Sequence, residues 1–219
     1  MQLMSEVKNS TSFVITSLRV AMVLLSLYSI ALAAVVVTTS LEVGGVPAAS
    51  GIDLLQTQFS SVVNSGLDNR SGTQPESRLR DGDGSDTTPG PRVSDGDSVT
   101  YYFDVSSYTG GYNISSIDIF LGHWGTGRTT IDDLDIHFST VSDDTDFSNV
   151  ILLGGSSTSF NVDPYDGRVR VDDGGANLAR RVAAVRITFN AVGDGWSTLY
   201  EIDIIGSSVF ASGTIFRIE

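Results

Sequence analysis

Residues 182–189 read VAAVRITF, and their second half alternates apolar with polar side chains. Val185, Ile187 and Phe189 fall on one side of an extended chain, and the polar residues between them fall on the other. This period of two is typical of a half-buried antiparallel strand, because successive side chains of a strand point to opposite faces of a sheet. The segment therefore predicts a strand with one face in a core and one in solvent.

The same alternation occurs four more times after Ser98. The further segments are residues 99–105 (VTYYFDV), 117–121 (IDIFL), 134–138 (LDIHF) and 200–205 (YEIDII). Turns rich in Gly and Asp separate the segments, and no amphipathic helical pattern follows residue 60. Short strands with such turns predict an all-β fold, a jelly-roll β-sandwich.

The composition excludes several classes of function. The chain has 219 residues, no Cys and 2 His, which removes disulfide scaffolds, thiolate zinc sites and cysteine nucleophiles. Its formal net charge is −13, so a phosphate-binding surface would oppose the protein's own field. We therefore expect no nucleic-acid partner.

The N-terminal region has the pattern of an export signal. Residues 20–37 (VAMVLLSLYSIALAAVVV) carry no charge, Lys8 and Arg19 precede them, and they contain the small-residue pattern Ala31-Leu32-Ala33. Residues 1–34 are predicted to be a signal peptide cleaved after Ala33 or Ala34. A retained membrane-anchor helix is the alternative, because the apolar run approaches the length of a span. Both interpretations export the rest of the chain, to a secreted, periplasmic or cell-surface location. Membrane contact is expected only through this segment, if it is not cleaved.

Three motifs, in order, carry a resemblance to a known family. They are Asp81-Gly82-Asp83, the segment 111–119 (GYNISSIDI), and the closing stretch 183–206 with its Gly195-Trp196 pair and LYEIDIIG. Together they resemble discoidin-like domains, also called coagulation factor V/VIII type C or galactose-binding-like domains. With the central segment 122–128 (GHWGTGR), the chain is similar to exported discoidin-like proteins of planctomycete and verrucomicrobial type. The resemblance places the domain at residues 38–206.

The resemblance implies an eight-stranded jelly roll with a structural calcium ion and with end loops that bind glycans, or in some members lipids or proteins. Its calcium side chains would be Asp81, Asp83 and Glu201, with Asp86 or Thr87 as additions. The chain departs from the family after the DGD motif, where residues 84–91 (GSDTTPGP) contain no tryptophan.

The residues of this acidic loop support a cation site without the resemblance. Residues 81–86 (DGDGSD) offer oxygen ligands at alternate positions, and glycines between them let a loop fold around a hard cation. The alternative interpretation is a solvated acidic turn. The acidic runs at residues 143–146 and 172–173 are interpreted as hairpin turns.

Candidate sugar-binding residues lie in two other loops. A sugar site needs an aromatic face for the pyranose ring and planar hydrogen-bonding groups for its hydroxyls. The candidates are His123, Trp124 and Arg128 in one loop, and Trp196 and Tyr200 around the last loop. The alternative is structural: either tryptophan can plug the end of the sandwich, with Arg128 bonded beneath it.

Nothing in the sequence predicts catalysis. His137 alternates with apolar neighbours and should point to solvent, and His123 is the one candidate base in a loop. No G-x-S-x-G nucleophile elbow accompanies it. We therefore predict an exported, non-catalytic module that binds a glycan or cell-surface polysaccharide with the help of structural calcium.

The alternative function is a self-assembling cell-surface protein. Residues 207–219 (SSVFASGTIFRIE) extend beyond the family's usual ending and read as an extra strand. Such a strand can cover an edge of its own sheet or pair with a neighbouring copy.

Overall fold

A computed structural model of the chain describes residues 35–42, 52–69, 72, 75–82, 90–121, 131–154, 166–192 and 195–210. By its contacts the chain divides into two units, Met1–Ala34 and Val35–Glu219. Every described residue belongs to the second unit. The predicted export segment, residues 1–34, and residues 211–219 of the predicted tail lie outside the described residues. Within these described ranges, no helix has the length and apolar character needed to cross a membrane.

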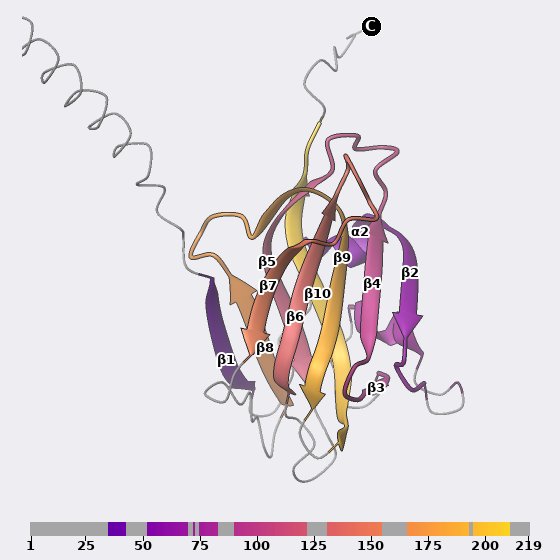
Figure 1. The fold of residues 1–219 in the computed structure, drawn as a ribbon, viewed down its shortest axis with the longest axis vertical. Helices are drawn as coiled ribbons and strands as arrows, with labels where there is room; N and C mark the ends of the chain where they lie inside the picture. The colour runs from indigo at the N-terminus through magenta and orange to yellow at the C-terminus, as the bar shows by residue number, and fades with distance from the viewer. Residues whose placement is uncertain are drawn as a thin grey trace, which may run out of the picture. The chain divides into compact units, whose positions relative to one another are not determined.

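The described residues form an antiparallel β-sandwich, as the alternation predicts. The strands are β1 (Val36–Glu42), β2 (Phe59–Ser65), β3 (Arg92–Val93), β4 (Ser98–Phe103), β5 (Tyr112–Leu121), β6 (Ile131–Thr140), β7 (Asn149–Gly154), β8 (Asp166–Asp172), β9 (Ala179–Val192) and β10 (Ser197–Ser208). One layer has the order β1-β8-β5-β10-β3, and the other has the order β7-β6-β9-β4-β2 (Figure 1). The two layers join where the start of β5 pairs with the start of β9.

All five predicted strands are present. Residues 182–189 lie within β9, whose Val185, Ile187 and Phe189 are 0% exposed. The other four predicted segments fall on β4, β5, β6 and β10. Their inward residues form one core between the layers, which explains the period of two in the apolar side chains.

Two short helices cover part of the outer face of β10. Helix α2 (Leu54–Thr57) begins at Asp53, whose carboxylate accepts a hydrogen bond from the Leu55 N–H as an N-cap. The 3-10 helix η1 (Glu76–Arg80) contacts the same strand. Because both helices lie on this side, β10 is buried on its outer face as well as its inner one.

The register defines the two ends of the sandwich. At the lower end, Leu121 pairs with Leu199, and Ile131 pairs with Val192. At the upper end, Tyr112 pairs with both Ser208 and Val182. The predicted sugar-binding loop, residues 122–130, therefore starts and finishes at the lower end, whereas the chain leaves β10 at the upper end (Figure 1).

Candidate functional site

Three buried carboxylates gather where α2 meets the outer face of β10. Asp53, Glu201 and Asp203 are 0%, 0% and 1% exposed. Each offers one carboxylate oxygen, and these oxygens all lie within 4.8 Å of one another. Glu201 and Asp203 are two residues apart on a strand, so they share a face, and Asp53 meets that face because it forms an isolated bridge with Ile205. We call these three residues the acidic triad.

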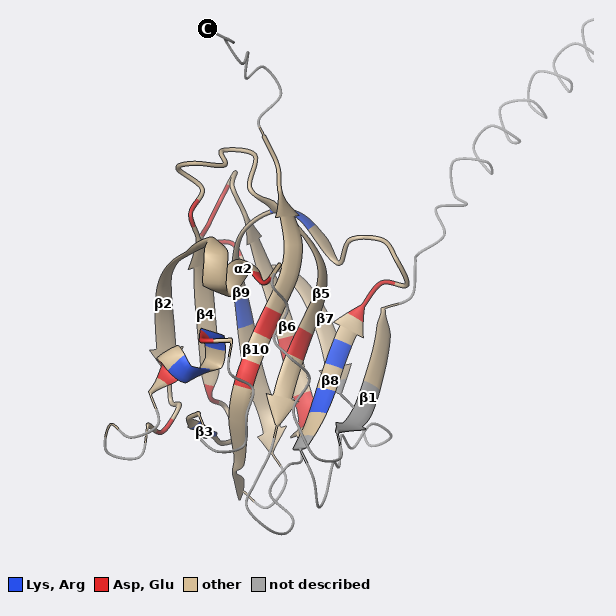
Figure 2. Ribbon diagram, turned by 180° about the vertical axis from the view of Figure 1, so that it is seen from behind, with Lys and Arg blue, Asp and Glu red and all other residues tan. Residues whose placement is uncertain are grey.

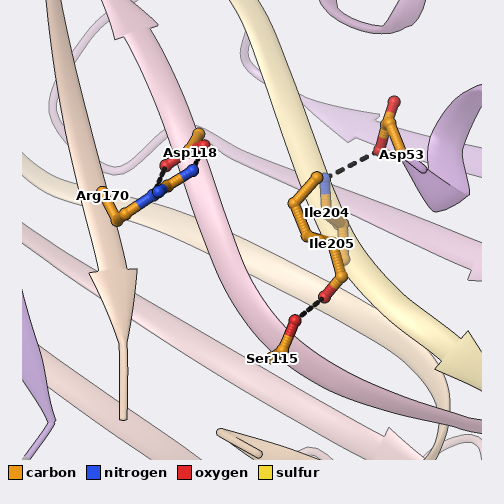
Figure 3. Close-up of polar contacts among 6 residues, drawn as sticks. All are labelled: Asp53, Ser115, Asp118, Arg170, Ile204 and Ile205. Atoms are coloured by element: carbon orange, nitrogen blue, oxygen red, sulfur yellow. Dashed lines mark hydrogen bonds and ion pairs between the residues drawn. The ribbon is translucent and has the colours of Figure 1, made fainter. Parts of the chain in front are cut away.

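The fold orients Asp53 toward β10. Its Oδ1 accepts hydrogen bonds from the Leu55 N–H at 3.0 Å and from the Ile204 N–H at 2.8 Å (Figure 3). Its other oxygen, Oδ2, is buried, and no hydrogen-bond donor among the described residues reaches it. One oxygen therefore fixes the side chain, and the other remains available to a ligand.

The two carboxylate oxygens of Glu201 also differ in their contacts. Its Oε1 accepts a hydrogen bond from the Gly82 N–H at 3.2 Å, whereas the buried Oε2 meets no donor within the described part of the chain. Gly82 has a φ of 78°, a left-handed conformation that favours glycine at this position. Gly82 follows η1, so this hydrogen bond ties the end of that helix to the acidic triad.

The environment of the triad disfavours bare negative charge. Burial, together with the nearby charges of Asp203, Asp81 and Asp53, raises the pKa of Glu201 from 4.5 to about 9, although the hydrogen bond from the Gly82 N–H lowers it. Burial likewise raises the pKa of Asp53 from 3.8 to about 6. Two of the three carboxyl groups therefore need a proton or a cation to compensate for desolvation.

A fourth buried carboxylate lies beside the triad but has its own counterion. Asp118 on β5 is opposite Asp203 in the register, and it accepts two hydrogen bonds from Arg170 on β8, at 2.7 and 2.6 Å (Figure 3). Figure 2 shows this charge pattern as acidic bands on β10 and β5 next to basic bands on β8. Arg170 uses both nitrogens on Asp118, and its charge also interacts with Asp203 of the triad.

The donor set of the triad fits a hard divalent cation. Calcium prefers six to eight oxygen ligands and takes them from carboxylates, backbone carbonyls and water. Two buried, unsatisfied carboxylate oxygens, on Asp53 and Glu201, are the observation that supports this fit. Neither sulfur nor imidazole is present in the triad, so softer metals have no favoured ligand there.

Of the metal ligands that the sequence predicts, one residue belongs to the acidic triad. Glu201 belongs to the triad. Asp81 lies in the exposed turn after η1, where its charge contributes to the raised pKa of Glu201. Asp83 and Asp86, with Thr87, lie outside the described residues. Asp53 and Asp203 were not predicted, although the two-residue spacing between Glu201 and Asp203 places both on one face of a strand.

Of the predicted sugar-binding residues, Trp196 is on the surface of the lower end and Tyr200 is not. Trp196 is half-buried and comes directly before β10. Tyr200 is 1% exposed and presents no ring face to solvent; it lies within β10, at a bulge between Leu199 and Glu201. His123, Trp124 and Arg128 lie outside the described residues.

An arginine braces the Trp196 ring. The guanidinium carbon of Arg92 on β3 lies 3.7 Å from the ring centroid, within the range of a cation–π contact. Arg92 is itself held at the lower end, because its backbone exchanges two hydrogen bonds of 3.0 Å with Asp68. The guanidinium beside the Trp196 ring therefore comes from Arg92, whereas the predicted Arg128 lies outside the described residues.

Comparisons with known proteins find structural similarity alone. No family model matches the chain, and no curated protein matches its sequence. Among solved structures, the lectin domain of lectinolysin complexed with Lewis b antigen is 8% identical, with a TM-score of 0.46, covering 73% of this chain and 100% of its own. A Streptococcus pneumoniae fucose-binding module is 10% identical, with a TM-score of 0.45, covering 77% and 100%.

A third similar structure is the family 32 carbohydrate-binding module from Clostridium perfringens NanJ, complexed with galactose. It is 15% identical to this chain, with a TM-score of 0.45, and the match covers 70% of this chain and 97% of that module. The strand architecture described above is the all-β sandwich that the alternation in the sequence predicts. The glycans named here are those of the neighbouring proteins.

Proposed function

We propose that the chain is an exported, non-catalytic module that binds carbohydrate at its lower end, with a calcium ion in the acidic triad. The observation that carries the glycan proposal is the half-buried Trp196 ring, braced by Arg92 at the end where residues 122–130 begin and finish. An indole ring fixed in this way offers an apolar surface whose position does not have to be ordered when a sugar arrives.

The proposed chemistry of recognition is stacking combined with planar hydrogen bonding. The apolar face of a pyranose packs on an aromatic ring, and its hydroxyls need donors and acceptors at the rim. Trp196 supplies a ring. We propose that the loop between β5 and β6 supplies a second ring and the polar groups, through His123, Trp124 and Arg128.

The cation would have a structural role. When bound, calcium would compensate the charge of Asp53, Glu201 and Asp203 and connect α2 to β10. Because Glu201 also accepts the Gly82 hydrogen bond, the same centre would hold the end of η1 against the sheet. No bond-making step is assigned to the ion.

A glycan array tests the proposal directly. We expect the purified chain to bind a defined glycan class in calcium, to bind it less in chelator, and to lose at least tenfold in affinity on Trp196→Ala. Leu152→Ala is the matched control, since Leu152 is a 69% exposed apolar residue on β7. No binding to any glycan by a folded protein would contradict the proposal.

Self-association is a second candidate, because β7 is an apolar edge strand. Among the described strands, β7 pairs with β6 alone, and Val150 and Leu152 on it are 37% and 69% exposed. Ser207 and Ser208 of the predicted extra strand are the end of β10, and residues 211–219 beyond it would be the suitable partner from a second copy. Sedimentation mass that rises with concentration, and that falls to the monomer value on deleting residues 211–219, would support this candidate. A monomer at every concentration would contradict it.

A further inference from the structure

A row of four aromatic rings runs from the core to the surface at the upper end. Ring centroids of Phe103 and Tyr112 are 5.1 Å apart, those of Tyr112 and Tyr108 are 5.7 Å apart, and those of Tyr108 and Phe210 are 5.5 Å apart. Exposure increases along the row: Tyr112 is 0% exposed, Tyr108 is half-buried and Phe210 is 53% exposed. We call Tyr108 and Phe210 the upper platform.

The backbone beneath the upper platform is fixed. The Tyr112 hydroxyl donates to the Asp104 carbonyl at 2.8 Å, and the Val209 N–H donates to the Gly111 carbonyl at 2.7 Å. Gly110 allows this approach, since a Cβ there would overlap the backbone of Val209 and Phe210. Two aromatic rings on a braced backbone form a pre-organised surface, which lowers the ordering cost of binding.

Hydrogen-bonding groups flank the rings. The Asp104 carboxylate accepts a hydrogen bond from the Ser106 N–H at 3.0 Å and another from the Ser107 hydroxyl at 2.9 Å. Hydrogen bonds from these two serines lower the pKa of Asp104, so the carboxylate is ionised and remains a strong acceptor. The segment that leads from β4 to Tyr108 therefore carries an ionised acceptor and two hydroxyls.

A strained arginine lies on the same end. Arg181 has a φ of 57°, and it is the one described residue other than glycine in the left-handed region. Its carbonyl accepts a hydrogen bond from the Val141 N–H at 3.0 Å, and its own N–H donates to Asn113 Oδ1 at 3.4 Å. Its backbone packs against Gly111, next to the platform. Its side chain is exposed and forms no ion pair with another described residue. Backbone strain of this kind persists only where its surroundings enforce it, and it accumulates at functional sites.

We infer that the upper platform, with Asp104 and Arg181, is a second carbohydrate site, specific for neutral pyranose units. Tyr108 and Phe210 would receive the apolar face of a sugar, and the carboxylate and guanidinium would take its hydroxyls. The carboxylates of Asp104, Asp143 and Asp144 outnumber the guanidinium groups of Arg180 and Arg181 at this end, and the remaining negative charge selects against uronates and sulfated sugars.

The residues of the upper platform are separate from those of the proposed lower-end site. The upper platform lies at the opposite end of the strands from Trp196, so one module would contact two glycan chains, or two parts of one chain. Two such sites increase avidity for a polymer without any new contact at either site.

The test uses the Trp196→Ala variant, in which the proposed lower site is removed and the upper one remains. Neutral oligosaccharides (cellohexaose, mannohexaose and galactohexaose) and the acidic hexagalacturonate are titrated while the Tyr and Phe ring signals are followed by carbon-13 NMR. We expect a neutral oligosaccharide to shift the signals of Tyr108 and Phe210. Phe210→Ala and Arg181→Gly should each weaken that binding at least tenfold, the second without strain since glycine accepts the left-handed conformation.

Arg180→Ala, at the neighbouring exposed arginine, is the matched control and should bind as the parent does. The inference is overturned if no neutral oligosaccharide shifts these rings, or if hexagalacturonate alone does. If the rings do not respond while the unmutated chain binds glycans through Trp196, the second site fails and the proposed function stands. A response of these rings in a protein whose Trp196→Ala change leaves array binding unaltered supports the second site and contradicts the first.

Discussion

Asp118 and Asp203 face each other across β5 and β10, two buried carboxylates in register, and Arg170 bonds the first of them with two nitrogens. Like charges directly opposite on neighbouring strands destabilise a sheet. The ion pair neutralises Asp118, while Asp203 joins Asp53 and Glu201 in the acidic triad. Because burial raises the pKa of Glu201 and Asp53, we expect the stability of the fold around the triad to depend on a bound cation or proton.

Calcium should stabilise the folded chain, and Glu201→Gln should remove that effect. Any ligand that binds the folded state alone adds stability, about 2.7 kcal/mol at a concentration 100 times its Kd. We expect thermal scans of the unmutated chain to move upward when calcium replaces chelator. Glu201→Gln should unfold at the same temperature in both buffers, whereas Asp144→Asn, at an exposed turn, should respond as the parent does. Superimposable scans of the parent would refute a calcium site.

Without metal, stability should decrease as the pH rises. The folded state raises the pKa of Glu201 from 4.5 to about 9, so it holds a proton that the unfolded chain has released. The contribution of this proton to the free energy of unfolding is therefore complete below pH 4.5, the pKa of Glu201 in the unfolded chain. It is lost as the pH rises toward 9, with a slope of at most about 1.4 kcal/mol per pH unit for one proton. Asp53 adds a similar loss between 3.8 and about 6.

Urea unfolding of the metal-free chain at pH 5, 7 and 8.5 measures this slope. Glu201→Gln should flatten the decrease above pH 6, because glutamine has no proton to lose. Calcium should reverse the trend in the parent, since cation binding strengthens as the carboxylates ionise. A metal-free parent whose stability rises between pH 6 and 8.5 would contradict the burial that the fold gives to Glu201.

Much of this fold could be predicted from the sequence, and the site only in part. Alternation identified β4, β5, β6, β9 and β10, because each has one face in the core. Glu201 was predicted from a resemblance. The triad also needs Asp53, which is distant in sequence and lies beside Glu201 only because α2 packs on β10. Tyr200 was predicted to lie beside the last loop, but it is buried within β10, as its place in the alternating segment 200–205 indicates.

The Asp118 and Arg170 pair should show strong coupling in a double-mutant cycle. The Asp118 side chain is 3% exposed and that of Arg170 is 38% exposed, so removing the arginine leaves a buried charge that water reaches on one side only. We expect Arg170→Met to destabilise the chain by about 2 to 3 kcal/mol, less than the penalty for a fully buried pair because of this exposure. Asp118→Asn combined with Arg170→Met should recover at least about 1 kcal/mol of that loss. Additive effects in urea unfolding would show that the two side chains act independently.

Replacing Gly110 by alanine should detach the end of the chain from the upper platform. A Cβ at Gly110 would overlap the backbone of Val209 and Phe210, and backbone atoms cannot yield as the end of a side chain can. We expect the loss of the Val209 hydrogen bond to Gly111 and of the ring contact between Phe210 and Tyr108. The free energy of unfolding should change by no more than about 1 kcal/mol, because Tyr108 and Phe210 lie at the margin of the core. Amide exchange at Val209 and the ring signals of Phe210 measure the detachment. Gly174→Asn is the control, since that glycine has open space around it and asparagine tolerates its φ of 59°. Unchanged protection of the Val209 amide in Gly110→Ala would show that this approach of the two backbones is not what holds the end of the chain.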